Sequence, residues 1–153
     1  MSRGLGDVYK RQDLSGAAPE RAIICGVRLY RVIVPVRDIE AASTFYGEVF
    51  GSPGERVSGG RHYFDAGGVL FACYDPVADG DKRTSEPNPE HLYLSTTEPL
   101  ESVRDTWTGG GGTLDDGIRE RPWGETSFYG RDPWGNRVVF VAAGTEYTGG
   151  VWG

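Results

Sequence analysis

The chain has 153 residues, the size of one domain, and 38% hydrophobic side chains are enough to fill a core. Its net charge of −6 argues against nonspecific nucleic-acid binding, which needs a basic surface, and no apolar stretch approaches the roughly 20 residues that span a bilayer. The two cysteines, Cys25 and Cys73, form neither a disulfide framework nor a zinc-binding spacing. We therefore expect a cytoplasmic protein with no nucleic-acid partner and no membrane partner.

The N-terminal part of the chain separates into two segments. Residues 1–12, MSRGLGDVYKRQ, differ in character from the rest and resemble a translated adapter sequence, so we interpret them as a non-native leader. Residues 13–28 are interpreted as an N-terminal extension. Neither segment enters the fold prediction.

Residues 29–75 predict a strand, a helix and three further strands. The run LYRVIVPVRD (29–38) alternates in polarity as a strand does, and a helical stripe of apolar residues follows over 39–51. Asp38 is suited to cap the start of this helix and Gly51 to end it. A short strand is expected near 54–58, and two more within 61–75, on either side of a Gly67-Gly68 turn.

The same order of elements returns in residues 91–143, after a polar, proline-rich linker at 76–90. HLYLSTTE (91–98) predicts a strand and 99–112 a helix that ends in four glycines. A strand near 113–119 and two more within 125–143, around the turn DPWGN, complete the repeat. The tail, 144–153, either folds over a cup or frays.

The fold class is therefore α+β, one domain of two βαβββ modules, with a helix on one face of each sheet. Two motifs, V-x-V-x-D-I-E-x-x-x-x-F-Y-x-x-V-F-G at 34–51 and F-Y-x-R-D-P-W-G-N-R-V-V-F at 128–140, resemble the vicinal oxygen chelate superfamily of glyoxalase I, bleomycin-resistance proteins and extradiol dioxygenases. The resemblance covers about 29–143. It implies a curled mixed sheet that forms a cup, and a homodimer.

The resemblance also locates four positions that hold a divalent metal in metal-dependent members: Arg31, Phe71, His91 and Val139. Arginine has no acceptor atom, and phenylalanine and valine offer no donor atom to a metal. One histidine cannot hold a metal specifically. The sequence therefore predicts no metal and no cofactor.

The alternation along each strand predicts which side chains point into the cup. We expect an apolar and aromatic wall with a few polar groups, as in small-molecule sites. The expected ligand-binding residues are Arg31, Ile33, Phe71, Tyr93, Ser95, Trp123, Arg137 and Val139, with Cys73 on the same face as Phe71. Arg31 suits an anionic group, or alternatively pairs with an acid of the chain such as Glu125. Trp123 either stacks on a planar ligand or covers the end of the sheet.

Two functions follow from these residues. The first is a bleomycin-resistance-like protein that binds a small, partly aromatic or anionic molecule in a metal-free cup. The alternative is a lyase, isomerase or dioxygenase of the same superfamily that uses His91 or Glu125 as an acid–base group, with or without a divalent metal. His91 is alternatively a structural residue at the start of its strand.

Overall fold

The computed structural model describes residues 26–149, so the interpretation of residues 1–12 as a leader concerns a segment outside the described residues. From Arg31 onward the described chain forms a single compact unit. Within residues 26–149, no helix has both the length and the apolar character that a membrane span requires.

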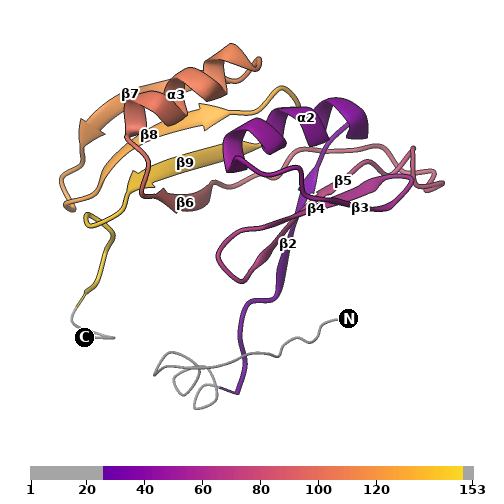
Figure 1. Ribbon diagram of the computed structural model, residues 1–153, viewed down its shortest axis with the longest axis horizontal. Coiled ribbons are helices and arrows are strands. Elements are labelled where there is room, and N and C mark those ends of the chain that lie inside the picture. Colours follow the sequence, from indigo (N-terminus) through magenta and orange to yellow (C-terminus); the bar gives the residue numbers. More distant parts are fainter. Residues whose placement is uncertain (1–25, 150–153) are drawn as a thin grey trace. The chain divides into compact units, whose positions relative to one another are not determined.

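The first module contains β2 (Arg31–Pro35), α2 (Ile39–Phe50), β3 (Glu55–Ser58), β4 (Arg61–Asp65) and β5 (Leu70–Tyr74). Its sheet has the order β2-β5-β4-β3, in which β2 pairs parallel with β5 and the other pairs are antiparallel. Figure 1 shows α2 on one face of this sheet. The parallel pair requires a long crossover, and α2 begins that crossover.

The second module repeats this arrangement with β6 (Leu92–Thr96), α3 (Leu100–Gly109), β7 (Thr113–Glu120), β8 (Thr126–Arg131) and β9 (Arg137–Ala142). Its sheet has the order β6-β9-β8-β7, again with one parallel pair, between β6 and β9. The predicted fold of two βαβββ modules is confirmed. The two sheets remain separate four-stranded sheets and do not close into a barrel.

The ends of the helices follow from the residues that flank them. The Asp38 carboxylate accepts a hydrogen bond from the Ala41 amide at 3.1 Å, and Gly51 has the left-handed φ of 64° that ends α2. Pro99 precedes α3 and provides no side-chain cap. Helix α3 ends at Gly109, the first of the four glycines.

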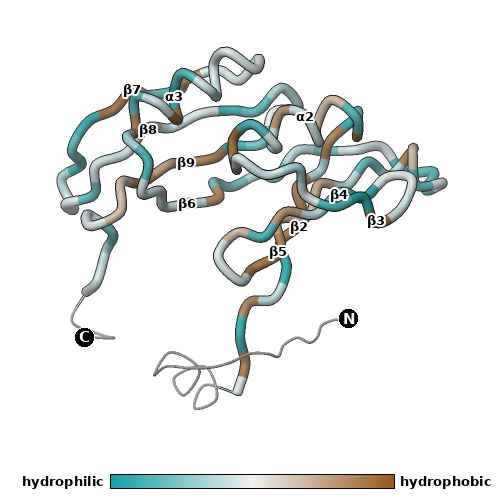
Figure 2. The backbone as a smooth tube through the Cα atoms, viewed as in Figure 1, coloured by the Kyte–Doolittle hydropathy of each residue, from teal (hydrophilic) through white to brown (hydrophobic). Residues whose placement is uncertain are grey.

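An aromatic core lies between the helices and the sheets. The Phe45 ring on α2 packs edge-on against Trp107 on α3 at 5.0 Å, and Trp107 packs against Phe140 on β9 at 5.3 Å. Figure 2 shows the hydrophobic stretches along β5 and β9. Each of these strands lies inside its sheet and pairs in parallel with an edge strand, β2 or β6. A Cβ atom at Gly110 would lie 3.0 Å from Phe45, so glycine at this position permits the close approach of the two helices.

The turn between β8 and β9 joins the two modules. The Asp132 carboxylate is 4% exposed and accepts a hydrogen bond of 2.7 Å from the Tyr46 hydroxyl of α2. Asn136 donates from its side chain to the Pro35 carbonyl oxygen at 2.6 Å. The turn that the sequence predicts is therefore also the polar contact between the two modules.

The register of β5 corrects the predicted position of Phe71. In the parallel pair, Val32 lies opposite Phe71 and Ile33 opposite Ala72, and partners in a parallel pair point to the same face. Phe71 and Cys73 therefore lie on the helix-covered face, where the Phe71 ring is 4.7 Å from that of Tyr46. The expectation that they share a face with Arg31 and Ile33 is wrong, because counting from Gly68 misplaces the strand by one residue and so reverses its faces.

Candidate functional site

Each sheet has one face that its helix does not cover, here called the open face. On the open face of the second sheet, Tyr93 of β6 lies beside Val139 of β9, which lies beside Tyr129 of β8. In the next row, Ser95 lies beside Val141 and then Ser127. The strand register thus places Tyr93, Ser95 and Val139 on one face, as the sequence predicted.

Two tyrosines and one histidine form an aromatic cluster on this open face. The hydroxyl oxygens of Tyr93 and Tyr129 are 3.3 Å apart, and the His91 ring packs edge-on against Tyr129 at 5.3 Å. The hydrogen bond to Tyr129, with partial burial, raises the pKa of Tyr93 to about 12. At neutral pH the Tyr93 phenol is therefore protonated and can donate or accept a hydrogen bond. Its side chain is 54% exposed, so it is accessible to a ligand.

Arg121 packs against Tyr129 of this cluster, a contact that the sequence did not indicate. Its guanidinium donates to the Ser127 hydroxyl at 2.9 Å and to the Asp116 carboxylate at 2.6 Å, and lies 4.7 Å from the centre of the Tyr129 ring. Hydrogen bonds from Arg119 and Arg121 lower the pKa of Asp116 to about 2. The charge of Arg121 is thus balanced within the protein, and we regard Arg121 as a residue that positions Tyr129. No local motif marks this contact, because it crosses an irregular β7–β8 pair.

A pocket of about 270 Å³ lies at the edge of the aromatic cluster. It brings together the predicted residues Tyr93, Ser95 and Glu125, and adds Glu146 and Tyr147 from the tail. The full lining consists of Tyr93, Leu94, Ser95, Glu125, Val141, Glu146 and Tyr147. Residues 150–153 of the tail lie outside the described residues, so the expectation for the tail as a whole stays a prediction.

The other predicted residues lie around this pocket or away from it. Trp123 is 56% exposed and donates from its ring nitrogen to Glu125 at 2.8 Å, which places it beside the pocket. Arg137 lies opposite Arg131 at the start of β9. Arg31 and Ile33 lie on the open face of the first sheet, where Arg31 donates to the Tyr63 hydroxyl at 2.8 Å.

The residues at the four implied metal positions do not fit a divalent metal. The register replaces Phe71 by Ala72 as the open-face residue of β5, so the set becomes Arg31, Ala72, His91 and Val139. Only His91 among them has a lone pair for a metal. Among residues 26–149, no group of three or more histidine, cysteine, aspartate or glutamate residues is arranged to hold a metal ion.

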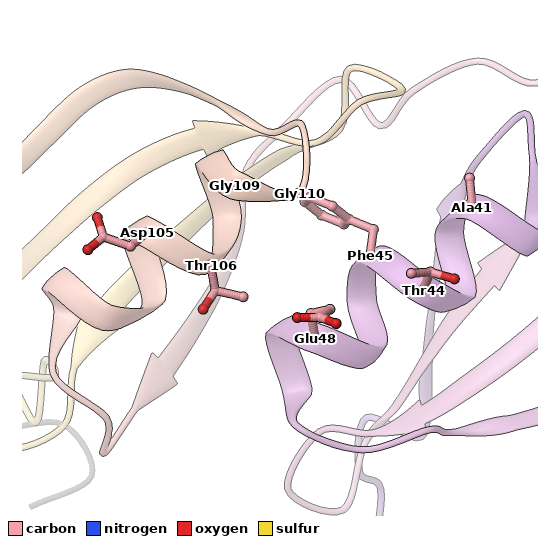
Figure 3. Close-up of a pocket in the computed structure, with 8 residues that line it drawn as sticks. All are labelled: Ala41, Thr44, Phe45, Glu48, Asp105, Thr106, Gly109 and Gly110. Carbon is pink, nitrogen blue, oxygen red and sulfur yellow. The ribbon is translucent and has the colours of Figure 1, made fainter.

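A larger cavity lies elsewhere, between α2 and α3. Figure 3 shows Phe45 pointing from α2 toward Gly110, with Glu48 and Thr106 facing each other across the groove. Its volume is about 720 Å³, yet it contains none of the predicted site residues and lies on the helix side of the sheets. We therefore place the candidate site at the smaller pocket, where the predicted residues meet.

Comparisons with known proteins agree with this fold. The family model described as Glyoxalase/Bleomycin resistance protein/Dioxygenase superfamily matches residues 28–140. A glyoxalase-related enzyme from Fulvimarina pelagi is 21% identical, with 80% of this chain and 93% of that chain covered and a TM-score of 0.65. A glyoxalase/bleomycin resistance protein from Albidiferax ferrireducens T118 is also 21% identical, with 74% and 97% covered and a TM-score of 0.65.

A member of the same superfamily from Sphaerobacter thermophilus DSM 20745 is 22% identical, with 76% of this chain and 97% of that chain covered and a TM-score of 0.57. None of the curated proteins matches the chain. At these identities, the likeness to solved structures shows the fold, and the function has to be argued from the site.

Proposed function

Because the chain belongs to the glyoxalase/bleomycin resistance protein/dioxygenase superfamily, we propose that it binds a small, partly aromatic molecule on the open face of the second sheet, without a metal ion. The observation that carries this proposal is the pair of phenols formed by the exposed Tyr93 and the half-buried Tyr129, with His91 against them and a pocket at their edge. An apolar wall with a few placed polar groups is the usual composition of a small-molecule site.

The donor atoms support the metal-free part of the proposal. His91 is the single residue with a lone pair among the four positions that hold a metal in metal-dependent members of the superfamily. After incubation with nickel, cobalt, manganese, iron or zinc ions and desalting, mass spectrometry is expected to find far less than one metal per chain. A stoichiometric metal would contradict the assignment of these positions and return metal-dependent chemistry as the leading function.

The open face of the first sheet supports an extension of the proposal, in which the ligand also carries an anionic group. Arg31 lies beside Tyr63 there, and a guanidinium is the side chain best suited to a carboxylate. A ligand with both an aromatic ring and an acidic group would use both sheets. The cup that this requires forms between two copies of the chain, since the sheets remain unclosed and the open faces expose Ile33 and Tyr93. Sedimentation equilibrium that finds only monomer would contradict the homodimer.

Acid–base catalysis is a second candidate, which one observation favours. The Glu125 carboxylate lines the pocket next to Tyr93, where a bound molecule would meet it, whereas His91 is not among the lining residues. For any compound that the protein converts, Glu125→Gln is then expected to lower kcat more than His91→Ala does. The opposite order would move the catalytic role to His91.

Replacing Tyr93 by alanine is expected to weaken the binding of aromatic probes about tenfold or more, because one wall of the site and one hydroxyl are lost. The probes are 2-phenylethanol, which is neutral, and 3-phenylpropionate, which is anionic. Binding is measured by NMR titration of the aromatic and amide signals. Val77→Ala serves as the control, since Val77 is an exposed apolar residue outside both open faces. Equal affinities of the Tyr93→Ala variant and the unmodified protein would contradict the proposed location.

A further inference from the structure

We propose that the pocket beside Tyr93 is a subsite for a protonated amine, and that the ligand is an aromatic amine whose ammonium group binds between Glu125 and Glu146. This inference rests on the proposed function, because it assigns a chemical class to the ligand of the same open face. Under this inference, the ligand group that enters the pocket carries a positive charge, whereas the proposed function alone leaves that group neutral or negative.

Two carboxylates line the pocket, and each accepts a hydrogen bond from a neutral donor. Glu125 accepts a hydrogen bond from the Trp123 ring nitrogen at 2.8 Å, and Glu146 accepts one from the Gly144 amide at 3.0 Å. Both donors are neutral, so they hold the carboxylates in place without forming an ion pair with them. The Gly144 amide, and after it the Ser95 hydroxyl, lowers the pKa of Glu146, which is therefore ionised at neutral pH.

The Arg121 guanidinium, which lies beside the aromatic cluster, is engaged by residues other than these two carboxylates. Arg121 is 6% exposed and pairs with Asp116, and its other hydrogen bonds go to Ser127 and to the Gly117 carbonyl oxygen. The second arginine on Asp116 is Arg119, which is not among the residues that line the pocket. Among the described residues that line the pocket there is no lysine or arginine, so a ligand cation would meet the negative charge of the two glutamates, whereas a carboxylate would be repelled.

The remaining walls fit a small organic cation attached to a ring. Tyr93 and Tyr147 contribute aromatic faces to the pocket, and a cation over an aromatic ring is attracted by the ring's electrons. The volume of about 270 Å³ is small for a whole ligand, since ligand pockets commonly measure roughly 300–1,000 Å³. The pocket thus suits an ammonium head group, while the ring of the ligand packs on the exposed Tyr93 and the half-buried Tyr129.

The test compares three probes that share one ring and differ in charge: 2-phenylethylamine, 2-phenylethanol and 3-phenylpropionate. We expect the amine to bind about tenfold more tightly than the alcohol, since hydrogen bonds to charged groups are the stronger ones. In the double variant Glu125→Gln/Glu146→Gln this preference is expected to disappear, while the affinity for the alcohol stays the same. Glutamine retains the acceptor oxygens for Trp123 and Gly144, so the pocket keeps its shape.

The matched control is the double variant Glu86→Gln/Glu120→Gln, which removes the same charge at exposed positions outside the pocket lining and is expected to keep the preference. If the alcohol or the acid binds at the second open face as tightly as the amine, or if the preference survives in Glu125→Gln/Glu146→Gln, the amine subsite is wrong and the proposed function stands. If none of the three probes shifts the signals of Tyr93 and Tyr129, both are wrong.

Discussion

Replacing Asp132 by alanine is expected to lower the free energy of unfolding by about 3 kcal/mol or more, because several buried donors lose their acceptor at once. One carboxylate oxygen accepts from the Trp134 and Asn136 amides at 2.9 and 2.8 Å. The other accepts from the Tyr46 hydroxyl at 2.7 Å and from the Asn136 side chain at 2.8 Å. Urea unfolding followed by tryptophan fluorescence measures the loss.

Two further variants separate this network from a general effect of charge. Asp132→Asn keeps one acceptor oxygen and is expected to lose less stability than Asp132→Ala. Asp115→Ala removes a carboxylate whose partner is the half-exposed Arg131, and such surface pairs contribute about 0–1 kcal/mol. Similar losses in Asp132→Ala and Asp115→Ala would contradict the structural role of the turn.

The ionisation of Asp132 adds a dependence on pH with a defined sign. Burial raises the pKa of this carboxyl, against the hydrogen bonds that lower it. A carboxyl whose folded-state pKa is raised binds its proton more tightly in the folded protein. The stability that comes from this tighter proton binding is therefore fully present below the unfolded-state pKa and is lost as the pH rises through the folded-state pKa. Asp132→Asn is expected to flatten this part of the stability profile.

Replacing Trp107 by alanine is expected to cost about 3–5 kcal/mol, the range for removing a large aromatic side chain from a core. The ring is fully buried, packs edge-on against Phe45 and Phe140, and donates to the Thr113 carbonyl oxygen at 3.1 Å. A Cβ atom at Gly130 would lie 2.6 Å from the ring nitrogen, so the surroundings are already closely packed. Differential scanning calorimetry measures the loss.

Trp123→Ala is the matched control, since it removes the same side chain from a site where it is 56% exposed. Surface substitutions of this kind change stability by about 0.5 kcal/mol or less. Equal melting temperatures of Trp107→Ala and Trp123→Ala would show that α3 is not packed as described.

The fold could be predicted because each element carried its own local signal. Asp38 and Gly51 delimit α2, and the DPWGN turn separates β8 from β9. The face of β5 could not be predicted reliably, because one residue in the turn after Gly68 decides whether Phe71 or Ala72 is on the open face. Local patterns determine where a strand lies more firmly than they determine its register.

The candidate site could be predicted in part. Tyr93, Ser95 and Val139 share a face because β6 and β9 alternate regularly, and this face followed from the sequence. The contributions of Arg121 and Glu146 did not follow from it. Arg121 acts through contacts across an irregular strand pair, and Glu146 belongs to a tail whose sequence has no periodicity. Contacts that depend on tertiary packing produce no regular spacing of residues in the sequence, so a sequence pattern cannot predict them.

The hydrogen bonds of Asp132 and Asn136 to the first module also affect how the chain folds. The hydrogen bond from Asn136 to Pro35 spans 101 residues, and that from Tyr46 to Asp132 spans 86. The corresponding turn of the first module, from Ala66 to Val69, closes through its own backbone hydrogen bond and lacks such a pair of side chains. The two repeats are therefore not interchangeable. A fragment with only the first repeat would leave a buried hydroxyl without its acceptor, so the halves are expected to fold as one cooperative unit, with late closure of these long-range contacts.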